Sequence, residues 1–448
     1  MKKSNQGCSI KCSIIILNYQ GEKVIAETVN SVLNSDFNKN NYEIIIVDNC
    51  STDNSRTIID KLVTKLPNNI RKLYLDTNHG FAGGNNPGIK IARGKYVVLL
   101  NNDCVVDIDW LSYLYKTITS SSNIFSVTSK LLIYPKYFKL ELPIETLDVL
   151  TSCTLVSSHF LKFSKNNKIN IPVDFLKQIE LNVPFDSKQD KQIKLELCFA
   201  DSPSTELCSQ IKRIDFIKKI FIKDKTIQIT IDIQNKYIID NAFNKVQNAG
   251  TMVFQDGYAR DIGAKVSQNH QDYEIDNTQY HEQLPVYAFC GAAVMLNVHI
   301  LKKIGYLDET FFMYYEDVEI SERARLAGYQ NIFCPKAISR HLHAFSSLEW
   351  SPFFIYNVER GRLVHTFYHF PLTVFIKEYI VFLGKSIVIF LKSFNQNTIN
   401  TTNLNVSTNI ISSLPKLSRT KLKYSRIYQT NAINKNYKNI INGYWYTL

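Results

Sequence analysis

Three polar residues, Asn101, Asn102 and Asp103, follow directly on the apolar run YVVLL at residues 96–100. Such a run of β-branched, aromatic and leucine residues is typical of a buried parallel strand, whereas the oxygen-bearing side chains after it are costly to bury. In open α/β sheets, ligands bind beyond the carboxyl ends of the strands, so the tripeptide indicates the floor of a binding site. A polar turn that caps a helix over residues 110–118 is the alternative.

The elements that would position these residues follow from the pattern of residues 12–132, where short apolar runs alternate with amphipathic stretches. Strands that alternate with helical patterns predict a doubly wound, mostly parallel α/β sheet. The carboxyl ends of its strands would then meet at one edge, where the chain has Asn18, Asp48, Asp76 and residues 101–103.

The composition limits the function classes. The chain has 448 residues, 45% of them hydrophobic, and a formal net charge of +12, and this length suits about two to three domains. A basic surplus is compatible with an anionic substrate, nucleic acid or an anionic membrane face. The sequence has no basic run interleaved with aromatics and no zinc-finger spacing, so a nucleic-acid partner is not expected. Nine cysteines without a CxxC pair predict reduced thiols and a cytoplasmic setting.

Two regions depart from the alternating pattern. Residues 135–241 are lysine-rich, lack glycine and contain β-prone pieces such as KTIQITIDI, which predicts an inserted β-rich module. The later stretch LTVFIKEYIVFLGKSIVIFLK places its charges on one face of a helix and leaves a broad apolar face. This helix either packs on the protein or lies in a membrane interface, and the basic residues 416–426 support the second interpretation. Residues 395–408, rich in asparagine and threonine, predict a flexible linker.

Seven motifs then occur in one order: SIIILNYQGE, EIIIVDNCSTDNS, NHGFAGGNNPGI, YVVLLNNDCVV, VYAFCGAAVML, GYLDETFFMYYEDVEISERARLAGY and PKAISRHLHAFSS. Together they resemble glycosyltransferase family 2, in particular its branch of bacterial rhamnosyltransferase-like enzymes that build cell-surface polysaccharide. The resemblance covers about residues 12–362 apart from the insertion. It implies a GT-A fold, a nucleotide-diphosphate sugar as donor, Mg²⁺ or Mn²⁺ as cofactor, and inversion of the anomeric centre.

On this resemblance we expect four regions along the chain. They are a nucleotide-sugar-binding half of the GT-A domain (1–134), the inserted β-rich module (135–241), an acceptor-binding and catalytic half (242–362), and a C-terminal amphipathic helix, linker and basic tail (363–448).

The resemblance also places NND where the GT-A fold has its DxD metal motif. It implies that Asp103 is the carboxylate ligand, that Asn101 is a neutral ligand or a contact to the ribose, and that His341 is a further ligand. A divalent cation held there would neutralise the charge that develops on the diphosphate leaving group. With one carboxylate in place of two, we expect weak metal binding until the diphosphate supplies ligands.

The donor nucleotide is expected near the ends of the first two strands. Asp48 can accept the imide N–H of uracil or thymine, and guanine could donate to it too, so the base stays open, with a UDP- or dTDP-sugar favoured. Asp53 either contacts the nucleotide or caps the following helix. A glycine-rich turn would let the backbone approach the ligand, and a helix starting near Asn85, with Pro87 in its first turn, would offer its amides. The expected donor site contains Asn18, Tyr19, Asp48, Asp53, Gly83, Gly84, Asn85 and Asn101.

The segment FFMYYEDVE supplies the expected catalytic group. In the resemblance, Asp317 is the general base that takes the proton of the acceptor hydroxyl, and Glu316 binds or orients the acceptor. Tyr314 and Tyr315 would stack on a sugar ring. A carboxylate at a helix start is expected to stay ionised. An acidic first turn favoured by the helix dipole alone is the alternative.

The predicted function is inverting transfer of a sugar, with rhamnose a candidate, to a hydroxyl of a cell-surface glycan or a lipid-linked acceptor. The expected location is cytoplasmic, with a peripheral contact to the inner face of the plasma membrane. One alternative is a nucleotidyltransferase, which needs a basic glycine-rich phosphate loop where NYQGEK offers only Lys23. The other is a non-catalytic carbohydrate- or nucleotide-binding subunit.

Overall fold

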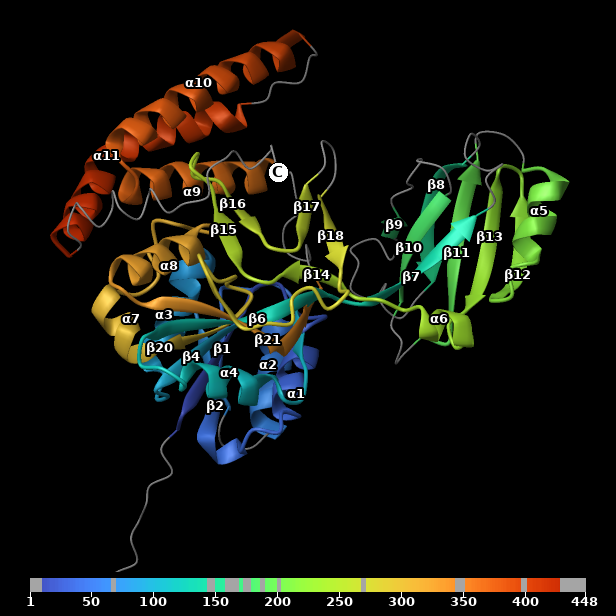
Figure 1. Ribbon diagram of the computed structural model, residues 1–448, viewed down its shortest axis with the longest axis horizontal. Helices are drawn as coiled ribbons and strands as arrows, with labels where there is room; N and C mark the ends of the chain where they lie inside the picture. Colours follow the sequence, from blue (N-terminus) through green and yellow to red (C-terminus); the bar gives the residue numbers. More distant parts are fainter. Residues whose placement is uncertain are drawn as a thin grey trace, which may run out of the picture. The chain divides into compact units, whose positions relative to one another are not determined.

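The computed structural model describes residues 10–65, 70–142, 150–157, 169–171, 179–185, 190–199, 203–266, 271–342, 351–395 and 401–427 (Figure 1). The chain forms two compact units. The first contains Met1–Leu131, Gln247–Tyr273 and Tyr280–Leu448, and the second contains Leu132–Val246 and Glu274–Gln279.

The first unit is built on a sheet whose N-terminal strands are parallel. Its order is β6-β20-β4-β1-β2-β3; β1 to β4 run parallel, and β20 runs antiparallel to β4 and β6. This arrangement confirms the predicted mostly parallel α/β sheet. In register, Asn18 lies beside Asp48 and Leu17 beside Asn101, so the polar strand ends share one edge. The strands are β1 (Cys12–Asn18), β2 (Tyr42–Asp48), β3 (Ile70–Tyr74), β4 (Tyr96–Asn101), β6 (Ile124–Ile133) and β20 (Ala293–Asn297).

Helices cover both faces of this sheet because successive strand residues point to opposite faces. Ile14 and Ile16 pack with α1, α2 and α4, whereas Ile15 and Val47 pack with α3 and α7. α4 confirms the helix predicted over residues 110–118. These helices are α1 (Ile25–Leu33), α2 (Ser55–Lys65), α3 (Gly80–Ile91), α4 (Trp110–Ile118) and α7 (Val298–Ile304), with a 3₁₀ turn η1 (Lys39–Asn41) before β2.

The helix α3 begins earlier than predicted. It starts at Gly80 rather than near Asn85, and Pro87 lies inside the helix rather than in its first turn. Gly80 has a φ of +68°, a conformation that glycine adopts without a steric penalty. The N–H of Phe81 donates to the carbonyl of Phe312 at 2.6 Å, so the helix start depends on a distant segment of the chain.

Shorter elements surround the polar edge of the sheet. β21 (Gln330–His341) pairs antiparallel with β5 (Cys104–Val106), which puts His341 opposite Cys104. β15 (Thr251–Val253) and β16 (Ala259–Asp261) form a hairpin. The other elements between residues 245 and 326 are β14 (Lys245–Asn248), β17 (Ala264–Val266), β18 (Gln271–Ile275), β19 (Leu284–Val286) and α8 (Glu316–Leu326).

Three helices follow: α9 (Pro352–His369), α10 (Leu372–Asn395) and α11 (Thr402–Ile427). α11 corrects the sequence interpretation, because it begins inside the predicted linker and includes the basic residues 416–426. Its Val406, Ile410 and Leu417 are buried in a core shared with α9, and this burial stabilises a helix that composition alone does not predict. Within the described ranges, no helix has the length and apolar character needed to cross a membrane.

The second unit is an antiparallel β structure with its own core, at the place where the sequence predicts a β-rich insertion. Its main sheet has the order β12-β13-β11-β8-β9, and β7 pairs with β10. The chain enters and leaves side by side, since Tyr137 and Phe243 exchange two backbone hydrogen bonds of 2.9 Å. The elements are β7 (Lys136–Leu142), β8 (Leu150–Ser157), β9 (Ile169–Ile171), β10 (Ile179–Phe185), β11 (Gln192–Phe199), α5 (Thr205–Lys212), β12 (Ile217–Lys223), β13 (Thr226–Asp232) and α6 (Lys236–Asp240).

Candidate active site

A cavity of about 790 Å³ lies at the polar edge of the sheet, within the first unit. All three residues of the NND tripeptide line it. They do not cap α4, whose N-cap is Asp109, so the structure supports the binding-site interpretation of the tripeptide over the capping alternative. Among the described residues that line the cavity, Arg260 is the single Lys or Arg, and the carboxylates are Asp103, Asp261, Glu316, Asp317 and Glu359.

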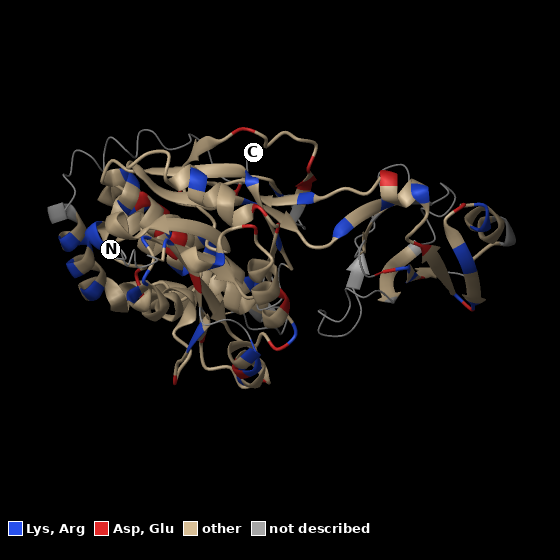
Figure 2. Ribbon diagram, turned by 90° about the horizontal axis from the view of Figure 1, so that it is seen from below, with Lys and Arg blue, Asp and Glu red and all other residues tan. Residues whose placement is uncertain are grey.

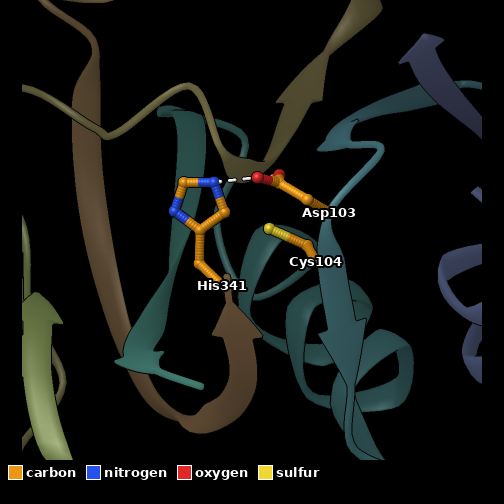
Figure 3. Close-up of side chains that lie close together, drawn as sticks. All are labelled: Asp103, Cys104 and His341. Carbon is orange, nitrogen blue, oxygen red and sulfur yellow. Dashed lines mark ion pairs between the residues drawn. The ribbon is translucent and has the colours of Figure 1, made fainter. Parts of the chain in front are cut away.

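Asp103 and His341 form a close pair on one wall of the cavity (Figure 3). The pairing of β5 with β21 brings them together, with Asp103 Oδ1 at 3.0 Å from His341 Nε2. Asn101 Nδ2 lies 3.3 Å from the same Nε2. The other ring nitrogen of His341, Nδ1, lies 2.9 Å from Gln247 Oε1. A carbonyl oxygen accepts, so Nδ1 carries the proton in this pair.

This geometry suits a divalent cation. With the proton of a neutral His341 on Nδ1, the lone pair of Nε2 faces the Asp103 carboxylate, and two electron-rich atoms 3.0 Å apart need a positive charge between them or a second ring proton. Gln247 would orient the imidazole in the way that outer-shell partners orient metal-bound histidines. Asp103 and His341, with Asn101 beside them, therefore fit a Mg²⁺ or Mn²⁺ site.

Cys104 lies close enough to this pair to be considered as a third ligand (Figure 3). Its side chain is fully buried, and its Sγ lies 3.6 Å from the carbonyl oxygen of Ala292. Burial raises the pKa of the thiol well above its ordinary value. Because a protonated thiol is a poor ligand for a hard cation, we leave Cys104 out of the metal site.

Two adjacent carboxyl groups, Glu316 and Asp317, line the cavity at the start of α8. Asp317 Oδ2 accepts a hydrogen bond from the N–H of Gly291 at 3.1 Å, and its Oδ1 accepts from Val318 N–H at 2.8 Å. Glu316 is buried, and within the described part of the chain its Oε2 has no hydrogen-bond partner. A buried polar atom without a partner, beside a cavity, is suited to a ligand.

The tight turn before α8 explains how these groups are presented. Tyr314 and Tyr315 both have left-handed backbone angles, with φ of 67° and 70°. The turn packs against α9 at Gly361, where a Cβ would lie 2.9 Å from the Cβ of Tyr315. Only a glycine at position 361 allows this approach, and the sequence interpretation did not use it.

The protonation of the pair differs from the expectation that a carboxylate at a helix start stays ionised. Burial, followed by the neighbouring charge of Asp317, raises the pKa of Glu316 well above its ordinary value. Burial also raises the pKa of Asp317, against hydrogen bonds from Gly291 and Val318 that lower it. Glu316 therefore keeps its proton at a pH where Asp317 is ionised, and desolvation outweighs the helix dipole.

This order of titration predicts the pH dependence of any reaction that uses Asp317 as a base. A base acts when deprotonated, and a raised pKa keeps it protonated to a higher pH. As the pH is lowered, turnover should therefore fall with an apparent pKa above that of an ordinary aspartate, about 3.9. Rate profiles of the wild type and of Glu316→Gln should both show this acid limb. An acid limb at the ordinary aspartate pKa, or one that vanishes in Glu316→Gln, would contradict the assignment of the limb to Asp317.

Two of the expected donor residues, Tyr19 and Asn101, line the cavity, but Asp48 does not. Asp48 is fully buried, with Oδ1 at 2.7 Å from Arg56 Nε and Oδ2 accepting from Asn18 Nδ2 at 2.9 Å. Burial acts to raise its pKa, but hydrogen bonds from Ser51, Arg56 and Asn18 outweigh this and lower it. Asp48 and Asn18 thus stabilise the strand ends beside the cavity without lining it, whereas the next residue, Asn49, lines the cavity.

The remaining donor candidates serve packing. Asp53 Oδ1 accepts from Ser55 N–H at 3.0 Å, which is the helix-capping role that the sequence left open. At Gly84, a Cβ would lie 2.6 Å from Leu17 Cδ1, so this glycine lets α3 approach β1, and at Gly83 it would lie 2.8 Å from His79 Cβ. Asn85 is buried and donates to the Phe81 carbonyl at 3.0 Å. The glycine-rich motif reaches the cavity through Asn78, Gly80 and Phe81 near its start.

The two tyrosines before Glu316 have different surroundings. Tyr315 is buried, and its hydroxyl donates to the Gly257 carbonyl at 3.1 Å and accepts from Ala259 N–H at 3.0 Å. These two hydrogen bonds hold its hydroxyl in place, and Tyr315 also lines the cavity. Tyr314 is half-buried, lines the cavity and packs edge-on against Phe354, with ring centroids 5.1 Å apart. The stacking role predicted for the two tyrosines stays a prediction.

Sequence reasoning missed Arg260, Gln247, Asn49 and Phe353, all of which line the cavity. Asn49 stands directly after Asp48 in the motif EIIIVDNCSTDNS, whereas Arg260, Gln247 and Phe353 lie outside the seven motifs and reach the cavity through the tertiary structure.

The family comparison concerns the N-terminal part of this chain. Residues 13–175 match the family described as Glycosyl transferase family 2. Over 95 residues the chain is 38% identical to poly(ribitol-phosphate) beta-N-acetylglucosaminyltransferase TarS of Staphylococcus aureus, which covers 21% of this chain and 16% of TarS. Over 93 residues it is 38% identical to UDP-Glc:alpha-D-GlcNAc-diphosphoundecaprenol beta-1,3-glucosyltransferase WfaP of Escherichia coli, which covers 20% of this chain and 34% of WfaP.

The alignments thus span about a sixth and a third of these two relatives. A crystal structure of S. aureus TarS in complex with UDP-GlcNAc superposes with a TM-score of 0.37 at 18% identity, covering 80% of this chain and 66% of that one. This likeness is too remote to support an argument. Residues 13–175 of this chain are thus similar to glycosyl transferase family 2, and the chain is similar over part of its length to two curated glycosyltransferases.

Proposed function

We propose that this protein is an inverting glycosyltransferase. It moves a sugar from a nucleotide-diphosphate donor, favoured as a UDP- or dTDP-sugar, to a hydroxyl group of a cell-surface glycan or lipid-linked acceptor. The observation that carries the proposal is that one cavity is lined both by the Asp103–His341 pair and by the Glu316–Asp317 pair. The first pair suits the diphosphate and its cation, and the second suits the attacking hydroxyl.

In this mechanism the ionised Asp317 accepts the proton of the acceptor hydroxyl as its oxygen attacks the anomeric carbon. The backbone N–H groups of Gly291 and Val318 hold the carboxylate in place. Protonated Glu316 donates a hydrogen bond that orients the acceptor. On the donor side, Asp103 and His341 would hold the cation, which supplies charge neutralisation for the leaving diphosphate when it is bound.

Arg260 supports an anionic substrate. It lies on β16, next to Ala259, which contacts the tyrosine that precedes Glu316. Its Nε is buried without a hydrogen-bond partner among the described residues. A guanidinium that lines the cavity is suited to a phosphoryl group of the donor or of the acceptor.

The relatives suggest which substrates to test. TarS is named for the transfer of N-acetylglucosamine to poly(ribitol-phosphate), and WfaP for the transfer of glucose to a diphosphoundecaprenol-linked sugar. Rhamnose remains a candidate from the family resemblance, so UDP-GlcNAc, UDP-Glc and dTDP-rhamnose form the first panel.

The test is a screen of nucleotide sugars for release of the nucleoside diphosphate, with Mg²⁺ or Mn²⁺ and with a chelator. We expect one donor to be hydrolysed only in the presence of metal. A nucleotidyltransferase would instead form a nucleotide sugar and pyrophosphate from a nucleoside triphosphate and a sugar phosphate. Binding of a donor without turnover, with any acceptor, would favour a non-catalytic subunit.

The second unit is proposed to be an accessory module for acceptor or partner binding, because every residue that lines the cavity belongs to the first unit. We expect excision of residues 138–242, with a short glycine-serine link between Tyr137 and Phe243, to leave donor hydrolysis within a few-fold of the wild type. Calorimetric donor binding and donor hydrolysis are the measurements. A folded excision variant that no longer binds donor would refute the assignment.

A further inference from the structure

The helix α10 carries an exposed apolar stripe made of Leu372, Ile376, Ile380, Ile387 and Leu391. Their exposed fractions lie between 45% and 62%. At 3.6 residues per turn, these five positions fall within an arc of about 100° of the helix. Phe375 and Phe382, about 120° around the helix from the centre of the stripe, are buried and join the core shared with α9 and α11. The stripe therefore points away from the protein, on a helix that lies at the outside of the bundle (Figure 1).

Positive charge accompanies this stripe. Lys377, Lys385 and Lys392 of α10 are exposed and lie on one side of the stripe, about 40° to 120° around the helix beyond its edge. The single acidic residue of α10, Glu378, is buried, with its Oε2 at 3.8 Å from Arg362 Nη1. Residues 363–448 contain ten Lys or Arg and one acidic residue, so they hold nine of the twelve surplus positive charges of the chain. Figure 2 shows the charged residues of the described part.

We propose that the stripe on α10 docks on a membrane surface that contains anionic lipids, with the helix lying in the headgroup region. Leucine and isoleucine side chains would enter the boundary of the acyl chains, while the flanking lysines would extend to the phosphates. A charge every seven or eight residues opposes burial of the whole helix in hydrocarbon and suits a position parallel to the surface. Each lysine near an anionic surface strengthens binding about fivefold.

The docked helix is connected to the cavity wall. Arg362 of α9 forms an ion pair of 3.0 Å with Glu359, and Glu359 lines the cavity. The same Arg362 lies near Glu378 of α10. The role of these contacts rests on the proposed function. They would hold the acceptor side of the cavity at a fixed height over the membrane surface that presents a lipid-linked acceptor. Membrane docking itself is independent of the reaction.

The test is flotation of the full-length protein with vesicles of phosphatidylcholine alone and with vesicles that also contain phosphatidylglycerol. We expect binding to the anionic vesicles that weakens with salt. Lys385→Gln with Lys392→Gln should weaken it about 25-fold, since two lysines are removed. Ile380→Ser with Ile387→Ser should weaken it at least about tenfold through lost apolar contact.

Matched controls exist elsewhere in the chain. Ile108 is 64% exposed, like Ile380, but lies outside α10, so Ile108→Ser should leave vesicle binding unchanged. Lys302→Gln with Lys303→Gln removes two exposed lysines of α7 and should have a much smaller effect than the α10 pair. Thermal unfolding and circular dichroism check that each variant folds.

Three outcomes would overturn the proposal. The protein would not float with either vesicle type, or the α10 and control variants would bind equally well. In the third outcome, light scattering would find a dimer that Ile380→Ser with Ile387→Ser dissociates, and the stripe would then be an interface between two copies. Donor hydrolysis measured without vesicles separates a failure of docking from a failure of the proposed function.

Discussion

Replacement of Asp317 by asparagine is expected to lower sugar transfer about 10²- to 10⁴-fold while donor affinity stays within a few-fold of the wild type. The amide preserves the shape of the side chain, and its oxygen can still accept from Gly291 or Val318. It cannot take the proton of the attacking hydroxyl. The loss should therefore appear in turnover, because the transition state needs the base and the bound donor does not.

The adjacent carboxyl group provides the matched control. Glu316→Gln keeps the size of the side chain and replaces a carboxyl group whose pKa burial raises well above its ordinary value. We expect it to raise the apparent acceptor KM more than it lowers turnover. Steady-state kinetics with varied acceptor and calorimetry with the donor measure both effects. If Asp317→Asn transfers sugar at nearly the wild-type rate, the base lies elsewhere; if it loses donor binding instead, Asp317 is on the donor side of the cavity.

Replacement of Asp103 by asparagine is expected to weaken donor binding in the presence of Mn²⁺ by at least about 10- to 100-fold, the range found when support of a metal site is removed. Asparagine keeps the size of the side chain but removes the one carboxylate that faces His341 Nε2. A chelator should have the same effect on the wild type and no further effect on the variant, because both act on the same cation. Calorimetric titration of the donor, with and without metal, measures this.

Two further variants test whether the effect is specific to the proposed metal ligands. Gln247→Leu leaves both ligands in place but frees His341 Nδ1, so its effect should be smaller than that of Asp103→Asn. Asp261→Asn removes another carboxylate from the same cavity, where its Oδ1 accepts from Asn248 rather than from His341, and should leave the metal dependence intact. Equal donor affinity in Asp103→Asn and wild type, with or without chelator, would contradict the assignment of Asp103 as a metal ligand.

Local pattern was sufficient for the elements on which the site stands. Apolar runs such as residues 96–100 determine their strands through β propensity and burial, and amphipathic spacing predicts α4 at its observed bounds. Because parallel strands end at one edge, the shared position of Asn18, Asp48 and Asn101 follows from the order of the elements. The polar tripeptide after β4 and the acidic start of α8 could be recognised for the same reason.

The sequence by itself thus determined the sheet, the edge that holds the site and the residue types that reach it. Tertiary structure decided which side chains face the cavity: Asp48 is enclosed by Arg56 and Asn18, and Asn49 lines the cavity instead. It also joined Asn101 to His341, 240 residues apart, and turned the asparagine-rich residues after 401 into a helix. Burial and hydrogen-bond pairing are set by contacts between distant segments, and these contacts fix the orientation, protonation and exposure of side chains that local spacing leaves open.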